Sequence, residues 1–287
     1  MAIMKDSQSI TPKTLYVVAT PIGNLGDISA RALEILSGVD FILSEDTRRS
    51  GLLLEHFGIH GHLVSYFAHN EALRTDQFLP RLLDGQSAAI ITDAGTPGIS
   101  DPGSRLVDAC LEAGIQVCPV PGACAAVAAV SASGFYQYTG FEFVAFFPRK
   151  SSERQALFEQ TIHRSTLLVG YESPQRIVSL IEDLVAVAGE DRRVCLCREI
   201  TKKFETIERT RAGTLLEKLR ESPCKGELCL IIEGENTPTQ TEGLSADDLK
   251  LIRILKEHQI SARDIRDIVS SYSGAKARDV YQAAMGD

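Results

Sequence analysis

Three turns rich in glycine and proline carry residue types that could bind a small molecule. They lie at residues 20–27, at residues 93–103 and from Pro121 onward. Gly23 and Gly26 let the backbone approach a ligand at the start of a helix. The second turn holds more turn-forming residues than a simple connection requires, which favours a loop shaped around a ligand. Small residues after Pro121 permit close approach of a ligand or of a second subunit.

Several common chemistries lack their sequence signatures. The first turn does not have the G-x-G-x-x-G spacing of a dinucleotide site, and no G-K-[ST] occurs, which excludes a P-loop. No nucleophile elbow or Ser/His/Asp triad signature is visible. The six histidines and seven cysteines show no metal-ligand spacing, so we expect no metal. Cys195 and Cys197 alternate in an apolar run, which predicts small core residues on one face of a strand.

The elements that position these turns alternate between strand and helix in the first half. Short apolar runs predict strands at 14–19, 41–43, 63–66, 88–92 and 117–120. The turns follow the C-terminal ends of these strands, where an open parallel sheet binds ligands. Asp27 is expected to cap a helix that carries apolar residues at 28, 32, 35 and 36. The pattern predicts an α/β domain with a parallel sheet.

The second half is typical of a smaller, mixed-sheet α/β domain. Strands are expected at 143–147, 166–171, 193–198 and 227–232, with an edge strand at 206–210. Ser245 with Asp248, and Ser261 with Asp264, are S-x-x-D signatures of helix starts. We therefore divide the chain into a flexible N-terminus (1–13), an N-terminal α/β domain (14–122), a second α/β domain (123–233), a linker (234–243) and a helical, helix-turn-helix-like tail (244–287).

Composition bounds the function further. The formal net charge of -8 argues against a nucleic-acid partner, because phosphate contacts need Lys and Arg, but it does not exclude local basic patches. No apolar run approaches the roughly 20 residues that span a bilayer, and the N-terminus lacks a signal-peptide pattern. We expect a soluble, cytoplasmic protein with no membrane partner.

Seven ordered motifs resemble the tetrapyrrole methylase superfamily and, within it, the enzymes that methylate small-subunit ribosomal RNA. They read LYVVATPIGNLGDI at 15–28, SEDTR at 44–48, TDAGTP at 92–97, PG at 121–122, YESPQR at 171–176, REITK at 198–202 and KGE at 225–227. The resemblance continues through the tail. Two departures stand out, because Ala123-Cys124 replaces a common Pro-Ser pair and Ala145-Phe146-Phe147-Pro148 replaces the usual Gly-Phe-Leu-Pro.

This resemblance implies a homodimer that binds S-adenosylmethionine in a cleft between two domains. It also implies methylation of the ribose 2′-hydroxyl of a decoding-centre cytidine in 16S ribosomal RNA, within the assembled 30S subunit. The cofactor-binding residues that it implies are Pro21, Ile22, Gly23, Asp93, Ala94, Gly95, Thr96, Pro97, Ala123, Cys124, Ala125, Tyr171 and Glu172.

A ribose hydroxyl is a weak nucleophile, so a general base should assist the transfer. Glu45, Asp46 and Glu172 follow predicted strands and are the candidates. Candidates for RNA binding are Arg48, Lys150, Arg198, Lys202, Lys276 and Arg278. Each charged residue could instead belong to a structural ion-pair network. Two other functions stay open: methylation of a small molecule such as a tetrapyrrole, and a non-catalytic ribosome-assembly module that binds RNA.

Overall fold

The computed structural model describes residues 10–138, 140–235, 244, 246–273 and 275–286. The chain forms two compact units, one of Met1–Ile162 with Thr166–Glu233 and one of His163–Ser165 with Gly234–Asp287. Within the described ranges, no helix has the length and apolar character needed to cross a membrane. Residues 1–9 of the predicted N-terminus and 236–243 of the predicted linker lie outside the described residues.

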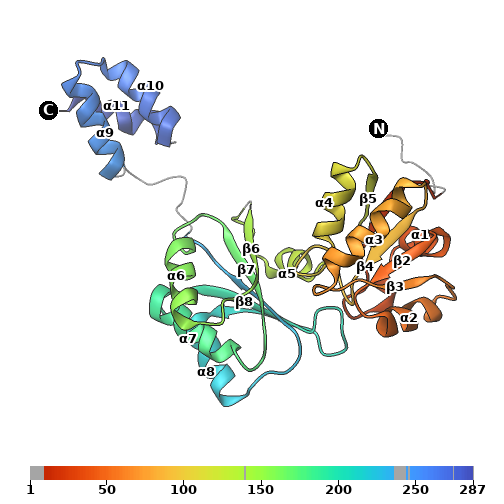
Figure 1. Cartoon of the computed structure of the whole chain (residues 1–287). Helices are drawn as coiled ribbons and strands as arrows, with labels where there is room; N and C mark the ends of the chain where they lie inside the picture. Colours follow the sequence, from red (N-terminus) through yellow and green to blue (C-terminus); the bar gives the residue numbers. More distant parts are fainter. Residues whose placement is uncertain (1–9, 139, 236–243, 245, 274, 287) are drawn as a thin grey trace. The chain divides into compact units, whose positions relative to one another are not determined.

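The first sheet of the larger unit is entirely parallel, as the sequence predicts (Figure 1). Its strands are β1 (Thr14–Val18), β2 (Phe41–Ser44), β3 (Leu63–Ser65), β4 (Ala88–Ile91) and β5 (Gln116–Val120). Their order is β3-β2-β4-β1-β5. Because all five run the same way, the turns after β1, β2, β4 and β5 emerge at one edge of the sheet.

Helices cover both faces of this sheet. They are α1 (Ala30–Gly38), α2 (Thr47–His56), α3 (Glu71–Leu83) and α4 (Ser104–Glu112). Leu15 points into the core beneath α3 and α4, whereas its neighbour Tyr16 points into the core beneath α1 and α2. Successive residues of a strand face opposite sides, so a strand buried on both sides is apolar throughout.

The predicted cap of the first helix was wrong by two residues. Asp27 ends a short 3-10 turn, η1 (Leu25–Asp27), and the helix begins at Ala30. The Ser29 hydroxyl accepts a hydrogen bond from the Ala32 N–H at 3.1 Å, which is the usual arrangement at a helix start. Asn24 occupies the equivalent place before η1, where its side chain accepts from the Gly26 N–H at 3.0 Å.

The second sheet is mixed, with strand order β6-β7-β10-β8-β9. Its strands are β6 (Phe141–Phe146), β7 (Leu167–Glu172), β8 (Arg193–Arg198), β9 (Thr206–Arg211) and β10 (Leu228–Ile232). Only β6 and β7 pair in parallel, and β9 lies at the edge as predicted. Cys195 and Cys197 point to the same face, as their alternation indicates.

The two faces of the second sheet are covered differently. One face packs against α6 (Ser151–Thr161), α7 (Ile177–Ala188) and α8 (Ala212–Glu221) in a large aliphatic core. The other face receives α5 (Ala125–Ser133), whose small residues Ala126 and Ala129 are fully buried there. Gly122 lies between β5 and α5, and the predicted domain boundary at that residue stays a prediction.

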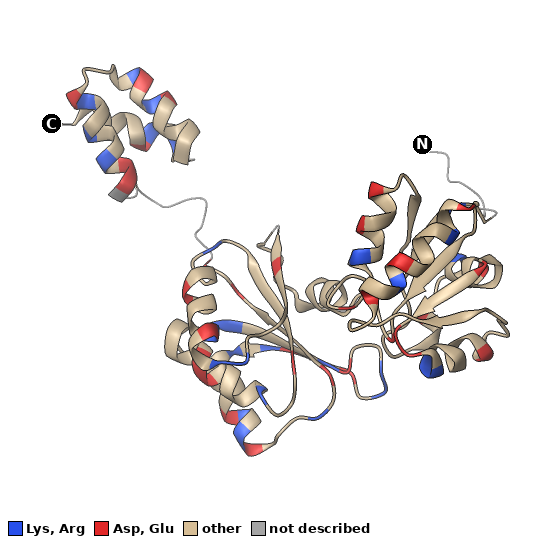
Figure 2. Ribbon diagram, in the orientation of Figure 1, with Lys and Arg blue, Asp and Glu red and all other residues tan. Residues whose placement is uncertain are grey.

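The C-terminal unit contains α9 (Ala246–Glu257), α10 (Ala262–Ser273) and α11 (Ala277–Met285) around a small apolar core. Ser261 caps α10 by accepting from the Asp264 N–H at 3.2 Å, as its signature predicts. Ser245, the first residue of the other signature, lies outside the described residues. Residues 244–287 carry seven Lys and Arg and seven Asp and Glu, and Figure 2 shows both signs on these helices. The tail is therefore charge-balanced rather than basic.

Candidate active site

Hydrogen bonds join three turns at the C-terminal edge of the parallel sheet. The Thr20 N–H donates to the Gly95 carbonyl at 2.8 Å, and the Gly95 N–H donates back to Thr20 at 3.1 Å. The Thr20 hydroxyl donates to the Thr92 carbonyl at 3.0 Å. The Thr96 hydroxyl donates to the Ala123 carbonyl, also at 3.0 Å. These bonds fix the turns after β1, β4 and β5 as one continuous wall.

This wall and the second sheet enclose a cavity of about 380 Å³ within the larger unit. Its volume is within the range of small-molecule sites. Eight of the residues predicted to bind the cofactor line it, namely Ile22, Ala94, Gly95, Thr96, Cys124, Ala125, Tyr171 and Glu172. Pro21, Gly23 and Asp93 instead line a second, more open cavity of about 430 Å³. Pro97 and Ala123 line neither cavity.

The charge of the first cavity points to the kind of ligand that it suits. Among the described residues that line it, none is Lys, Arg or His, whereas Asp101 contributes a carboxyl group. Cys124 and Ala125 stand at the start of α5, and Cys124 gives that helix no side-chain cap. A helix N-terminus attracts carboxylates, and an acidic lining attracts cations. A ligand with a carboxylate and a positive charge matches this pair of features.

Tyr171 connects the two halves of the cavity wall. Its hydroxyl accepts a hydrogen bond from the Ala126 N–H at 3.2 Å, in the first turn of α5. Its ring packs edge-on against Phe143 and Phe146, with centroid separations of 5.1 and 5.8 Å. Burial raises the pKa of Tyr171, so this phenol stays protonated. The predicted cofactor role of Tyr171 stays a prediction.

Gly23 makes room for protein rather than for the first cavity. A Cβ atom there would lie 2.3 Å from Cγ of Lys202 and 2.9 Å from Oγ1 of Thr201. Lys202 reaches past the turn to Glu199 at 3.0 Å and to Glu227 at 2.9 Å. The loop after β8 therefore packs on the first glycine turn. This lysine, predicted to bind RNA, already has two carboxylate partners in the structure.

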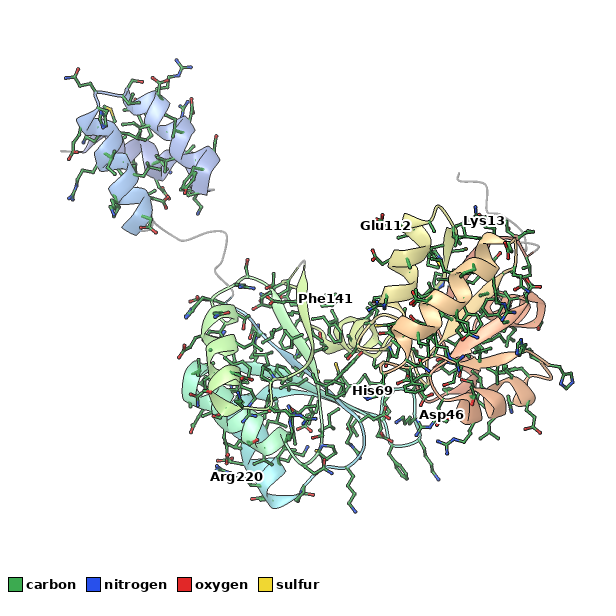
Figure 3. All side chains as sticks on the ribbon, in the orientation of Figure 1. Lys13, Asp46, His69, Glu112, Phe141 and Arg220 are labelled. Carbon is green, nitrogen blue, oxygen red and sulfur yellow. The ribbon has the colours of Figure 1, made fainter. Side chains whose placement is uncertain are left out.

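The predicted base Asp46 caps the N-terminus of helix α2 (Figure 3). Its carboxylate accepts from the Arg48 N–H at 2.9 Å and pairs with the Arg48 guanidinium at 2.7 Å. These bonds from Arg48 hold the pKa of Asp46 well below its usual range, which weakens it as a base. Arg48 itself is largely exposed. The structure thus favours a capping role for Asp46.

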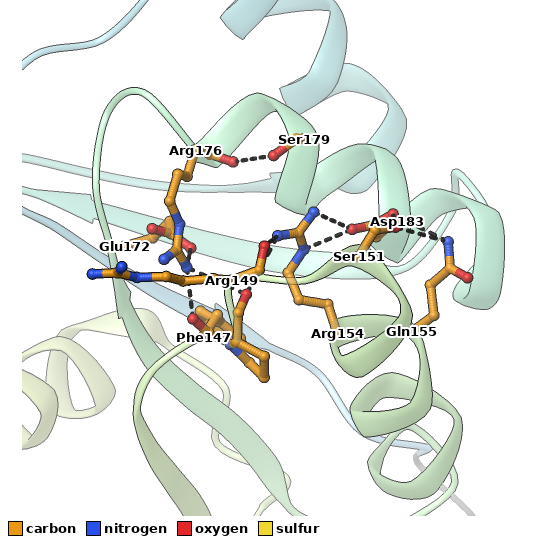
Figure 4. A network of polar contacts seen from close by, with 10 residues as sticks. Phe147, Arg149, Ser151, Arg154, Gln155, Glu172, Arg176, Ser179 and Asp183 are labelled. Atoms are coloured by element: carbon orange, nitrogen blue, oxygen red, sulfur yellow. Dashed lines mark hydrogen bonds and ion pairs between the residues drawn. The ribbon is translucent and has the colours of Figure 1, made fainter.

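Glu172 is buried and fully engaged, although its residue borders the cavity. Its carboxylate accepts from the Ser173 N–H at 2.7 Å and pairs with Arg176 at 2.6 Å (Figure 4). A buried carboxylate held this way positions the arginine and the chain around it. As with Asp46, its catalytic role was proposed on its place at a strand end, and that role stays untested.

Asp101 is the carboxyl group that sequence reasoning missed. It lines the first cavity, and burial together with the negative charges of Glu45 and Asp93 raises its pKa to about 6. Burial also raises the pKa of Glu45. Asp93 is held in place because it accepts from the Asp46 N–H at 3.2 Å and from Arg49 at 3.1 Å. The sequence pattern predicted a loop shaped around a ligand that includes Asp101-Pro102-Gly103, but it assigned no role to Asp101 itself.

The remaining residues predicted to bind RNA lie at separate places. Lys150 is exposed and pairs with Glu153 at 3.0 Å. Arg198 donates to the Thr206 hydroxyl at 3.3 Å. Lys276 precedes α11 and Arg278 lies in its first turn, both exposed, in the C-terminal unit. Lys276 and Arg278 thus lie at the start of the last helix, and contact of any of these residues with RNA stays a prediction.

Comparisons with known proteins agree with this architecture. The family model "Tetrapyrrole (Corrin/Porphyrin) Methylases" matches residues 14–216. The ribosomal RNA small subunit methyltransferase I of Escherichia coli O157:H7 is 42% identical over 98% of this chain and 99% of its own length. The protein of the same name from Halalkalibacterium halodurans is 39% identical over 97% and 98%. The chain belongs to the ribosomal RNA small subunit methyltransferase I family.

Solved structures of more distant proteins share the fold of this methyltransferase I family member. Uroporphyrin-III C-methyl transferase from Thermus thermophilus, complexed with S-adenyl homocysteine, superposes with a TM-score of 0.55 at 16% identity, over 77% of this chain and 97% of the other. Diphthine synthase gives 0.57 at 13% identity, over 94% and 99%. At these identities the likeness establishes the tetrapyrrole-methylase fold, which the sequence predicted.

Proposed function

We propose that the protein transfers the methyl group of S-adenosylmethionine to the ribose 2′-hydroxyl of a decoding-centre cytidine in 16S ribosomal RNA. The observation that carries the proposal is the cavity at the edge of the parallel sheet, in a chain that matches ribosomal RNA methyltransferases over nearly its whole length. The smaller tail unit is included in that match. A methylase of small tetrapyrroles shares the fold but not this extent of similarity.

S-adenosylmethionine fits the residues that line the cavity. The cofactor has a carboxylate, an ammonium group and a sulfonium, and it has no phosphate. The start of α5 at Cys124 and Ala125 suits the carboxylate, and the acidic lining, which includes Glu227, suits the positive charges. The described lining has no Lys, Arg or His to balance a phosphate, and its carboxyl groups disfavour a phosphate-bearing dinucleotide. When bound, the cofactor supplies an electrophilic methyl group.

We infer that Asp101 accepts the proton of the ribose hydroxyl. Its pKa of about 6 leaves it ionised at neutral pH yet more basic than an ordinary aspartate. Asp46 and Glu172 are weaker candidates, because Arg48 and Arg176 already neutralise them. Glu45 and Asp93 contribute by raising the pKa of Asp101. The base therefore lies in the loop after β4 rather than after β2.

The partners follow from the same proposal. A decoding-centre nucleotide is presented by the assembled 30S subunit, so we expect subunits to be better substrates than free RNA. We further propose that the protein acts in the cytoplasm as a homodimer, which light scattering coupled to gel filtration would test. Because the tail unit is charge-balanced, we expect it to contact the small subunit through its surface shape rather than through a strong positive charge.

The direct test is transfer of tritiated methyl groups to purified small subunits, to naked 16S RNA and to tetrapyrroles in parallel. The proposal predicts strong labelling of small subunits that lack the modification and none of tetrapyrroles. Labelling of tetrapyrroles alone would refute it. Calorimetry with S-adenosylhomocysteine separates the remaining alternative, because a non-catalytic RNA-binding module would show no binding.

A further inference from the structure

Strand β6 contains a bulge at the rim of the cofactor cavity. Phe143 pairs with Val169 and Phe146 pairs with Tyr171, so three steps along β6 match two steps along β7. Ala145 within this bulge has φ +56°, a left-handed conformation that costs energy for a residue with a Cβ atom. One extra residue in a strand reverses which side chains face each side of the sheet beyond it.

The reversal places Phe146 on the cavity side and Phe147 in the core. Phe146 lies opposite Tyr171, lines the cavity and is 59% exposed. Phe147 is buried, and its ring sits against Gly170 so closely that a Cβ there would lie 2.6 Å from it. Without the bulge, the first of these phenylalanines would face the core. The strand thus holds a large aromatic ring out in solvent beside the site.

Two arginines, the buried Arg154 and the half-buried Arg176, hold the backbone of the lip, which we define as residues 146–150. Arg176, paired with Glu172, donates to the Phe147 carbonyl at 2.6 Å. Arg154, paired with Asp183 at 2.5 Å, donates to the Arg149 carbonyl at 2.8 Å (Figure 4). Guanidinium groups bound to carboxylates are rigid donors. The lip is therefore a fixed platform rather than an adaptable loop.

The lip leaves the side chains of Phe146 and Arg149 exposed. Phe146 offers one open aromatic face beside Tyr171, to which its ring is inclined by 70°. Arg149 is exposed, and its guanidinium has no ion-pair partner in the ranges that the structure describes. In Figure 4 its side chain extends away from Arg154 and Asp183. An aromatic platform with an adjacent guanidinium is the combination that proteins use to hold an unstacked base and its phosphate.

We propose that Phe146 stacks on the base of the target nucleotide and that Arg149 contacts a neighbouring phosphate. This inference rests on the proposed function, because it takes the substrate to be a nucleotide of small-subunit RNA. It makes Phe146 a positioning residue: the stacked base brings its ribose to the cavity mouth. The ion-paired arginines Arg176 and Arg154 explain why the platform is rigid.

The test compares methylation kinetics of Phe146→Ala with Phe146→Trp and the control Phe141→Ala. Phe141 is an exposed phenylalanine at the far end of the same strand (Figure 3). Loss of one stacked base should raise the KM for small subunits about 10- to 100-fold, with kcat nearly unchanged. Phe146→Trp should keep the wild-type KM, and Phe141→Ala should behave as wild type. Arg149→Ala should raise KM and reduce its dependence on salt.

Two measurements without turnover complete the test. Calorimetry should give the same affinity for S-adenosylhomocysteine in Phe146→Ala as in wild type, and gel filtration should give the same oligomeric state. Weakened cofactor binding would make Phe146 a cofactor wall, and a changed oligomer would make it a subunit contact; either result overturns the inference. If the wild type is active on small subunits and Phe146→Ala has the same KM, this inference is overturned while the proposed function stands. Inactivity of the wild type on subunits refutes the proposed function itself.

Discussion

Replacing Asp101 by asparagine should stabilise the protein at neutral pH while it impairs methyl transfer. Burial and the charges of Glu45 and Asp93 raise the pKa of Asp101 from 3.8 to about 6 in the folded chain. The ionised carboxylate is therefore less stable in the folded chain than in the unfolded chain. Asparagine has nearly the same shape and carries no charge. The substitution removes that cost.

The magnitude and its pH dependence follow from the same shift. Well below pH 4 the carboxyl group is protonated in both states, so it carries no electrostatic cost. As pH rises toward 6, the unfolded chain releases the proton first, and the folded state loses stability relative to it. The full shift corresponds to at most about 3 kcal/mol. Because Asp101 is partly exposed, screening reduces the expected gain to about 1 kcal/mol.

The assay is urea unfolding of wild type, Asp101→Asn and a control, Asp76→Asn, from about pH 4 to pH 8. Asp76 is exposed on α3. The advantage of Asp101→Asn should grow between about pH 4 and pH 6 and then stay constant. Its kcat should fall about 100-fold or more above pH 6, and by less at lower pH, where Asp101 of the wild type is itself protonated. A pH-independent difference, or a loss of stability above pH 6, would refute the electrostatic reasoning. Full activity would refute the proton-acceptor role.

Three further predictions concern the frame around the site. Asp183→Asn leaves the guanidinium of Arg154 buried without its charge partner and should cost about 3–5 kcal/mol in the free energy of unfolding, measured with urea; a cost below that of a surface change would contradict it. Gly170→Ala should cost about 1–3 kcal/mol in the same assay, because the added methyl group would overlap the ring of Phe147; an unchanged midpoint would show that the ring can move. Truncation after Glu235 removes most of the smaller unit and should leave the melting temperature of the larger unit and its affinity for S-adenosylhomocysteine unchanged; loss of binding would show that the tail supports the site.

The parallel sheet and its functional edge could be predicted because they depend on local patterns. Each strand from β1 to β5 is a short apolar run, and β1, β4 and β5 lead into turn-forming residues that lie within a few positions of them. The cap at Ser261 was predictable for the same reason. The cap at Ser29 was missed because Asp27 offers an equally good local signal two residues earlier.

Other features depend on residues that are far apart in the sequence. Asp101 becomes a stronger base because the fold buries it and brings Glu45, from the turn after β2, near it; Asp93 of its own loop adds to the effect. Position 23 requires a glycine because the aliphatic part of the Lys202 side chain packs against it, although the two residues lie far apart in the sequence. No local pattern contains these distances. The positions of the turns could therefore be predicted from the sequence, whereas the roles of their side chains could not.

The bulge in β6 shows the same limit at short range. The apolar, aromatic run at residues 143–147 predicts this strand. The sequence also shows that Ala145-Phe146-Phe147-Pro148 replaces the usual Gly-Phe-Leu-Pro. Which phenylalanine faces the cavity depends on the register with β7 and on the left-handed backbone at Ala145. A strand pattern with period two assigns the faces the other way round.

The most direct test of the account is the position of the methyl group on the RNA. Small subunits labelled with tritiated methyl groups would be purified, and their RNA hydrolysed with alkali and also digested to nucleosides for mass spectrometry. Methylation of a 2′-hydroxyl removes the nucleophile that alkali requires, so the label should appear in an alkali-resistant dinucleotide and as 2′-O-methylcytidine. Label in a single alkali-released nucleotide with a methylated base would contradict ribose methylation and the role that we assign to Asp101.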